Sequence, residues 1–161
     1  MKTRKRPIPT DDVERRIIAD VDRFGWHVIL VADDSEGTDE GFDFAYSVGL
    51  FEGFKHPELL VIGLPKQVAH EVLNLLGERV KKGERFANGD VVEDVIDGYA
   101  VTFVEVEQGH YADYVGCGVW FYTGSGFPLL QVVWPDKKKR YPWDKDASEG
   151  FCEAQPLLGR R

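Results

Sequence analysis

The chain has 161 residues, of which 43% are hydrophobic and 30% are charged, a composition typical of one folded domain and unlike that of a disordered chain. The formal net charge of −8 argues against nucleic acid as a partner, because phosphate binding requires a basic surface. The sequence has no apolar run of membrane-spanning length and no secretory signal pattern. The two cysteines, Cys117 and Cys152, form neither a metal-binding motif nor a disulfide framework. We therefore expect a cytoplasmic protein.

The N-terminal region divides into an arm and the start of the domain. Residues 1–9 are predicted to be a flexible arm, and residues 10–161 a single globular domain. The domain begins with an amphipathic helix over residues 10–24, with Thr10 as its N-cap. Gly25 is expected to end this helix in a left-handed conformation.

Two strands are predicted next, separated by an acidic loop over residues 33–41. The apolar run 26–32, interrupted only by His27, predicts a buried strand. Residues 42–50 alternate between bulky and small side chains, as in a strand with two different faces. The small face permits close approach of a helix or of a ligand, and we expect a helix.

The rest of the chain continues the alternation of strands and helices. The pattern of apolar residues and turn signals predicts a strand over 59–64, a helix over 65–83, a hairpin of 91–96 with 99–106, a helical segment over 109–122 and a strand over 127–134. The expected fold is therefore a single α+β domain with a mixed, mostly antiparallel sheet and two to three helices.

Two histidine-containing segments supply candidate catalytic groups. His56 and Glu58 lie at the entry to a predicted strand, and His110 and Tyr114 lie at the start of the 109–122 segment. These residue types serve in acid–base catalysis and, with Asp113, could assemble a metal site. A histidine that fixes a turn or caps a helix explains the same positions, so we assign no metal site.

Aromatic residues are dense over residues 111–134, in the segment that follows His110. Tyr and Trp combine an apolar body with a hydrogen-bonding tip and often line pockets for flat ligands. The candidate ligand-binding residues are Tyr46, Tyr111, Trp120 and Trp134. An aromatic core or a homodimer contact would use the same residues, and both alternatives stay open.

Short motifs follow one another along the chain in a fixed order. They are Phe44-Ala-Tyr-Ser-Val-Gly-Leu50, His56-Pro-Glu-Leu59, Gly63-Leu-Pro65, Gly83-Glu-Arg-Phe86, His110-Tyr111, Asp113-Tyr114, Trp120-Phe-Tyr122, Phe127-Pro128, Gln131-Val-Val-Trp-Pro-Asp136 and Pro142-Trp143. In these motifs the chain resembles the bacterial domain of unknown function 4262 family over roughly residues 23–158. The resemblance implies family membership and no activity. The order of strand, His-Pro loop, strand and helix is also similar to flavin-reductase-like split barrels, which would imply a barrel instead of an open sheet.

The expected function is a binding module that engages a small molecule or a protein partner through an aromatic-lined pocket. The alternative is an enzyme that uses the same pocket, either flavin-dependent, metal-dependent or cofactor-free with acid–base chemistry. The sequence identifies no cofactor. The basic loop Lys137–Arg140 is interpreted as a solvated turn or as a site for an anionic ligand or partner.

Overall fold

The computed structural model describes residues 5–31 and 44–160, so the predicted acidic loop over 33–41 lies outside the described residues. The strands are β1 (His27–Val31), β2 (Phe44–Val48), β3 (Glu58–Ile62), β4 (Val91–Ile96), β5 (Tyr99–Glu105) and β6 (Leu129–Val133). The longer helices are α1 (Asp12–Phe24) and α3 (Lys66–Lys81). The short helices are α2 (Leu50–Phe54), the 3₁₀ helix η1 (Gln108–His110), α4 (Tyr111–Tyr114), α5 (Gly116–Tyr122) and α6 (Glu149–Ala154). The predicted α+β class is confirmed, although there are more helices than expected.

The strands form one six-stranded sheet in the order β1-β2-β3-β6-β5-β4. Neighbouring strands run antiparallel except β3 and β6, which are parallel. A parallel pair requires a long crossover connection, and here the chain makes it through α3, the β4–β5 hairpin, α4 and α5. Because β1 and β4 lie at opposite ends of this order, the described sheet is open. The split-barrel alternative therefore does not describe the fold.

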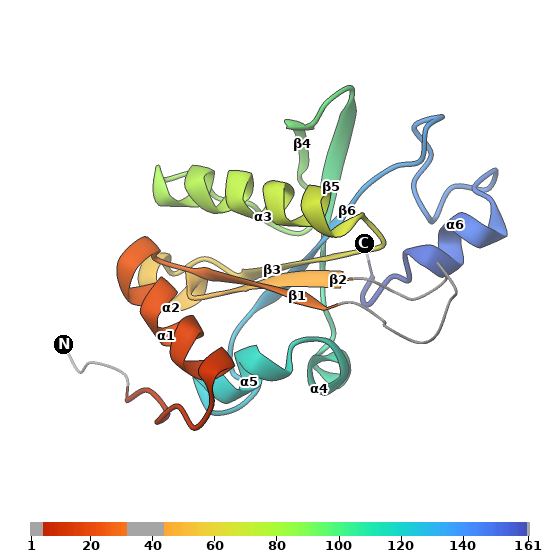
Figure 1. Ribbon diagram of the computed structural model, residues 1–161. Coiled ribbons are helices and arrows are strands. Elements are labelled where there is room, and N and C mark those ends of the chain that lie inside the picture. Colours follow the sequence, from red (N-terminus) through yellow and green to blue (C-terminus); the bar gives the residue numbers. More distant parts are fainter. Residues whose placement is uncertain (1–4, 32–43, 161) are drawn as a thin grey trace.

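The helices cover the sheet on both faces (Figure 1), with α3 on one face and α1, α4 and α5 on the other. The core on the α3 side includes Leu59, Val61, Leu73, Leu76 and Phe103. The core on the opposite face includes Ile17, Leu60, Ile62, Phe121 and Leu129. The central strand β3 thus sends alternate residues to the two cores, which explains why it is buried throughout.

Helix α1 begins at a side-chain cap and ends at a left-handed glycine. The Asp11 carboxylate accepts a hydrogen bond from the Glu14 amide at 2.8 Å, so Asp11 is the N-cap and the prediction of Thr10 was wrong. Thr10 instead donates from its hydroxyl to the Glu14 carboxylate at 3.0 Å. A carboxylate at the cap also suits the positive end of the helix dipole. Gly25 ends the helix with a φ of 103°, as predicted, and leads the chain into β1.

Strand β2 shows the predicted division into a bulky and a small face. Ala45 belongs to the core on the α3 side, whereas Tyr46 and Val48 belong to the core on the opposite face. Ala69 and Val72 of α3 share the core with Ala45. The element that approaches the small face is therefore a helix, as expected.

The segment 109–122 is not the single helix that its spacing predicts. It contains the end of η1, then α4 and α5, with a break at Val115, whose φ of −123° and ψ of 46° are not helical. Gly116 and Gly118 lower the helix propensity immediately after the break. The break at Val115 thus divides this segment into two short helices, of which each contributes residues to the core.

Two further short helices lie outside the elements that the sequence predicts. Helix α2 lies between β2 and β3, and α6 follows the loop after β6. Ser148 caps α6 by accepting a hydrogen bond from the Phe151 amide at 3.2 Å. Both helices are too short to show a periodic apolar pattern, which is why the sequence does not reveal them.

Arg6 connects the N-terminal stretch to three helices. Its guanidinium donates to Asp22 of α1 at 2.6 Å and to Glu52 of α2 at 3.1 Å. The same group lies 5.6 Å from the ring centroid of Phe121 in α5. Arg6 therefore joins the helices at one end of the domain, while the flexibility of residues 1–9 remains a prediction.

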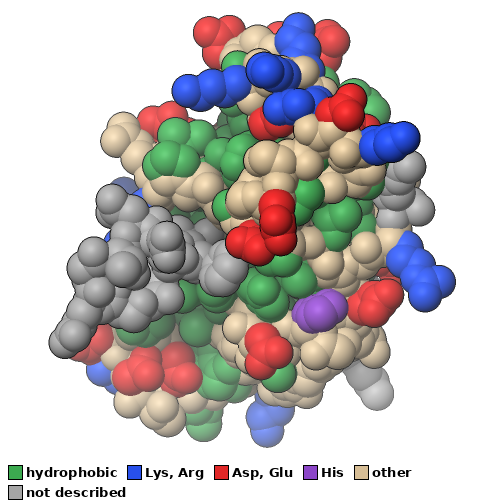
Figure 2. Space-filling model, turned by 90° about the vertical axis from the view of Figure 1, so that its right-hand side faces the viewer, with side chains coloured by type: hydrophobic (Ala, Val, Ile, Leu, Met, Phe, Trp, Pro, Cys, Tyr) green, Lys and Arg blue, Asp and Glu red, His purple; other side chains and the backbone are tan. Residues whose placement is uncertain are grey.

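No helix in the described ranges combines the length and the apolar character needed to cross a bilayer. The face on the side of α6 carries side chains of both charge signs (Figure 2), with several Lys and Arg gathered at its top beside Asp and Glu.

Candidate functional site

A polar hollow opens at the β1 edge of the sheet, where the end of α1, the start of β1 and the outer side of α3 meet. Its volume is about 340 Å³, at the lower end of the range for small-molecule sites. We term it the histidine hollow, and its lining residues are Asp20, Phe24, Trp26, His27, Val28, His70, Asn74, Glu78 and Lys81. The α3 residues lie about one turn apart, so one face of this helix forms a wall of the hollow.

An aspartate–histidine pair forms a second wall. The Nδ1 atom of His27 lies 2.6 Å from Oδ2 of Asp20. An ionised carboxylate only accepts hydrogen bonds, so Nδ1 of His27 carries a proton and donates it to Asp20. Nε2 has no hydrogen-bond partner among the described residues, and the His27 side chain is 14% exposed. Asp20 thus fixes the orientation of the His27 ring at the hollow.

A second series of polar contacts joins Trp26, which directly precedes β1, to α3. The indole N–H of Trp26 donates to Oδ1 of Asn74 at 3.0 Å, which fixes the orientation of the amide. The amide nitrogen of Asn74 lies 3.3 Å from both ring nitrogens of His70. Asn74 thus links the indole of Trp26 to the His70 ring, and both Asn74 and His70 line the hollow.

Close packing holds the Trp26 side of the hollow rigid. Trp26 is 6% exposed and lies against Gly77 of α3, where an added Cβ would be 2.6 Å from the indole ring. Phe54 packs edge-on against the same indole, with ring centroids 6.5 Å apart. A wall that is already ordered lowers the entropic cost of ligand binding. At the rim, Phe24 is 50% exposed and offers an apolar surface.

His56, a predicted catalytic candidate, is buried with both ring nitrogens bonded to the backbone. Its Nδ1 lies 2.8 Å from the carbonyl of Pro57, and its Nε2 lies 3.0 Å from the amide of Phe86. An amide only donates, so Nε2 is unprotonated and Nδ1 donates to Pro57. Burial lowers the pKa of His56, which keeps the ring neutral. His56 thus pins the entry to β3 against the loop at Phe86 and offers neither nitrogen to a ligand.

Glu58, the second candidate, is a buried hydrogen-bond centre between β2, α2 and α5. Its carboxylate accepts hydrogen bonds from the Ser47 hydroxyl and from the amides of residues 49–51, at distances between 2.8 and 3.2 Å, and from the Tyr122 hydroxyl. Burial raises the pKa of Glu58, and these hydrogen bonds oppose the rise. Burial and the Glu58 carboxylate also raise the pKa of Tyr122, so Tyr122 stays a donor.

His110 and Tyr114 lie on the opposite face of the sheet from His56. The His110 ring lies edge-on to Tyr114, with centroids 6.5 Å apart, and Tyr114 packs against Phe44 beside the core on that face. His56 packs against Phe86, which belongs to the core on the α3 side. The four candidates therefore do not converge on one cleft, and their catalytic role remains a prediction.

The predicted ligand-binding aromatics are tied to the backbone. The hydroxyl of Tyr46 accepts from a backbone amide of α5 at 3.1 Å. Tyr111 and Trp134 donate to backbone carbonyls, each at 2.8 Å. Trp120 is partly exposed and packs beside the core on the sheet face that α1, α4 and α5 cover. These contacts explain the aromatic segment as core packing, and its role in ligand binding stays a prediction.

Two sequence signals point to the histidine hollow. His27 interrupts an otherwise apolar strand, and His70 and Asn74 lie one turn apart on the polar side of α3. No sequence pattern indicates that Asp20 meets His27, because the chain reversal at Gly25 brings them together. That both histidines line one hollow likewise depends on how α3 lies across the sheet edge.

Fold and site together define an α+β domain with a preformed polar hollow of small-molecule size. A family model described as a domain of unknown function, DUF4262, matches residues 20–148. The chain belongs to this family, as its motifs predict. No curated protein and no solved structure matches the chain. Several of the motif residues surround Glu58, among them Ser47, Gly49 and Tyr122.

Proposed function

We propose that this protein is a small-molecule binding module whose ligand site is the histidine hollow. The observation that carries the proposal is the convergence of two histidines on one preformed hollow, with Nε2 of His27 oriented by Asp20 and left without a partner in the described residues. A few oriented polar groups beside an apolar wall are typical of ligand sites. The expected aromatic-lined pocket is thus proposed at Phe24 and Trp26, not at the segment 109–122.

The lining residues define the chemistry of the ligand. Nε2 of His27 offers a hydrogen-bonding position, the Glu78 carboxylate accepts hydrogen bonds, and the Lys81 ammonium donates them. Phe24 supplies a flat apolar surface at the rim. The ligand class that fits is a small molecule with hydroxyl or amine donors on one side and an apolar surface on the other.

The alternative function is a cofactor-free enzyme with acid–base chemistry, and the Asp20–His27 pair favours it. An imidazole oriented by a carboxylate is the usual arrangement of a general base. No Ser, Thr or Cys that could serve as a nucleophile is found among the described residues that line the hollow, so direct proton transfer is the reaction class that fits them. Among the described residues, no group of three or more His, Cys, Asp and Glu is arranged to hold a metal ion.

The test is an NMR titration of ¹⁵N-labelled protein with a panel of polyols, hydroxy acids and aromatic amines. The proposal expects at least one compound to shift the amides of residues 25–28 and 70–81. His27→Gln and His70→Gln should each weaken binding about tenfold or more, whereas His110→Gln, on the opposite face, should leave it unchanged. If no compound shifts these amides, or if both variants bind like the wild type, the proposal is wrong.

The same titration separates the two functions. A bound compound that is converted over time, with conversion lost in His27→Gln while binding persists, would establish the enzyme. Binding without conversion supports the module.

A homodimer through the aromatic segment remains a prediction, which a native mass spectrum of the purified chain checks. The free thiols of Cys117 and Cys152 support the proposal that the protein works in the cytoplasm.

A further inference from the structure

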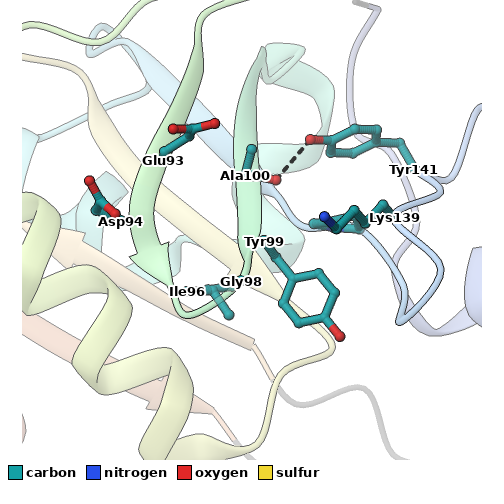
Figure 3. A pocket seen from close by; sticks show the side chains of 9 residues that line it. Glu93, Asp94, Ile96, Gly98, Tyr99, Ala100, Lys139 and Tyr141 are labelled. Atoms are coloured by element: carbon teal, nitrogen blue, oxygen red, sulfur yellow. Dashed lines mark hydrogen bonds between the residues drawn. The ribbon is translucent and has the colours of Figure 1, made fainter.

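A second hollow lies on the β4–β5 hairpin, at the opposite edge of the sheet from the histidine hollow (Figure 3). Its volume is about 390 Å³, which again suits a small ligand. We term it the hairpin hollow. Glu93, Ile96 and Tyr99 line it from the hairpin, and Lys139 and Tyr141 line it from the loop after β6.

A β-bulge creates this hollow. Val92 pairs with Val101 and Ile96 pairs with Tyr99, so residues 93–95 of β4 lie opposite Ala100 alone. Asp94, in the middle of the bulge, has a left-handed φ of 64°. Bulges bend the strand away from its partner and redirect side chains, and they are frequent beside functional sites. Here the Ala100 carbonyl accepts a hydrogen bond from the Tyr141 hydroxyl at 2.8 Å (Figure 3).

The loop after β6 positions Lys139 on the other side. The Asp136 carboxylate accepts from the amides of Lys138 and Arg140, each at 2.9 Å, and from the Arg140 guanidinium at 2.9 Å. These bonds close a tight turn in which Lys139 has a φ of 63°. The turn therefore neutralises Arg140 against Asp136 and leaves Lys139 as the cation that lines the hollow.

The charged residues that line the hairpin hollow are two carboxylates, Glu93 and Asp94, and one cation, Lys139. In Figure 3, Glu93 and Lys139 lie on opposite sides of β5. None of the ion pairs among the described residues joins them. Ile96 and Tyr99 add apolar surface along the hairpin end of the hollow.

We propose that the hairpin hollow binds a small zwitterion of the free amino-acid class. The ligand ammonium lies against Glu93, the ligand carboxylate lies against Lys139, and the ligand side chain packs on Ile96 and Tyr99. A simple anion is disfavoured by the two carboxylates of Glu93 and Asp94. A simple cation would leave the Lys139 ammonium facing a like charge, whereas a zwitterion matches both signs. This site is separate from the histidine hollow and does not depend on the function proposed there.

The test compares one amino acid with two analogues that each lack a charge. Leucine, N-acetyl-leucine without the ammonium, and leucinamide without the carboxylate are titrated separately into ¹⁵N-labelled protein, with the amides of residues 96–100 as reporters. Leucine should bind at least about tenfold more tightly than either analogue, because each analogue loses a charge-assisted hydrogen bond.

Matched variants locate the two charges. Glu93→Gln should weaken leucine about tenfold and should abolish the difference between leucine and N-acetyl-leucine. Lys139→Gln should do the same for leucinamide. Lys138→Gln, in the same turn but outside the hollow, and His27→Gln, in the other hollow, should bind leucine like the wild type.

Three results would overturn the proposal. The first is equal affinity for leucine and both analogues, and the second is an equal loss in Lys138→Gln and Lys139→Gln, which would indicate general attraction to the basic loop. The third is the absence of shifts in residues 96–100 with leucine and with the other free amino acids at about 10 mM. The two hollows lie at opposite edges of the sheet and have separate tests. If the amino-acid proposal fails, the proposal for the histidine hollow is therefore unaffected.

Discussion

His56 and Glu58 show how a buried polar side chain is matched by neighbours that can only donate or only accept a hydrogen bond. His56 faces one donor and one acceptor of the backbone, so a single neutral tautomer satisfies both. Glu58 is surrounded by donors alone. Neither residue can change its protonation or its chemistry without leaving a buried partner unsatisfied, which costs more than an ordinary hydrogen bond contributes.

The stability of the domain should depend on pH through His56. Burial lowers the pKa of His56 in the folded state, whereas the unfolded chain titrates near the usual value of about 6.5. Below that pH the unfolded state binds the additional proton, so the free energy of unfolding falls as the pH falls. Urea unfolding between about pH 7.5 and 5 should show a steeper fall for the wild type than for His56→Gln. His110→Gln should keep the wild-type slope, and parallel curves for wild type and His56→Gln would contradict the prediction.

Replacing Glu58 by Gln should destabilise the domain by about 2–3 kcal/mol. The amide group of Gln would place its own N–H donors against the donors of Ser47, residues 49–51 or Tyr122. Urea unfolding near pH 7 measures the change. Glu107→Gln, at an exposed position, should change stability by less than about 0.5 kcal/mol. A loss for Glu58→Gln no larger than that of this control would show that the hydrogen-bond centre is not stabilising.

The contact between helix α3 and Trp26, which directly precedes β1, depends on Gly77. An alanine normally stabilises a helix interior relative to glycine by about 1 kcal/mol. At Gly77 the added methyl would lie 2.6 Å from the Trp26 ring, so the indole or the helix must move. The position of Trp26 in the wall of the histidine hollow therefore requires a residue without a side chain at position 77.

Gly77→Ala should destabilise the domain by about 1–3 kcal/mol, against the helix propensity. The comparison is Gly150→Ala in α6, where nothing lies within 4 Å of the added methyl and a gain of up to about 1 kcal/mol is expected. Thermal unfolding followed by tryptophan fluorescence gives both values. If the two substitutions shift Tm in the same direction, the close contact of Gly77 with Trp26 is not decisive.

At the scale of the whole molecule, Arg6 joins helices that are distant in the sequence. It bonds to Asp22 of α1 and Glu52 of α2 and lies over Phe121 of α5. Its side chain is 29% exposed, so solvent screens these ion pairs only in part. Arg6 thus contributes to how the helices on this side of the sheet are held together.

Arg6→Gln should lower the free energy of unfolding by about 1 kcal/mol, in the range of partly exposed ion pairs. The loss should shrink at high salt, because salt weakens the ion pairs of the wild type. Urea unfolding at low and high ionic strength measures both effects. Arg16→Gln, an exposed arginine of α1, serves as the control, and equal losses for the two variants would rule out a specific role for Arg6.

The sequence by itself determined the strands, the two longer helices, the α+β class and the family, because apolar periodicity and turn residues act over short stretches of chain. It also indicated the small face of β2, since Ala45 alternates with bulky neighbours. Only the tertiary structure decided that His56 and His110 lie on opposite faces, and that Asp20, His27 and His70 share a hollow. The reason is physical: these meetings depend on chain reversals and on the position of α3 across the sheet, which are set by packing between residues far apart in the sequence.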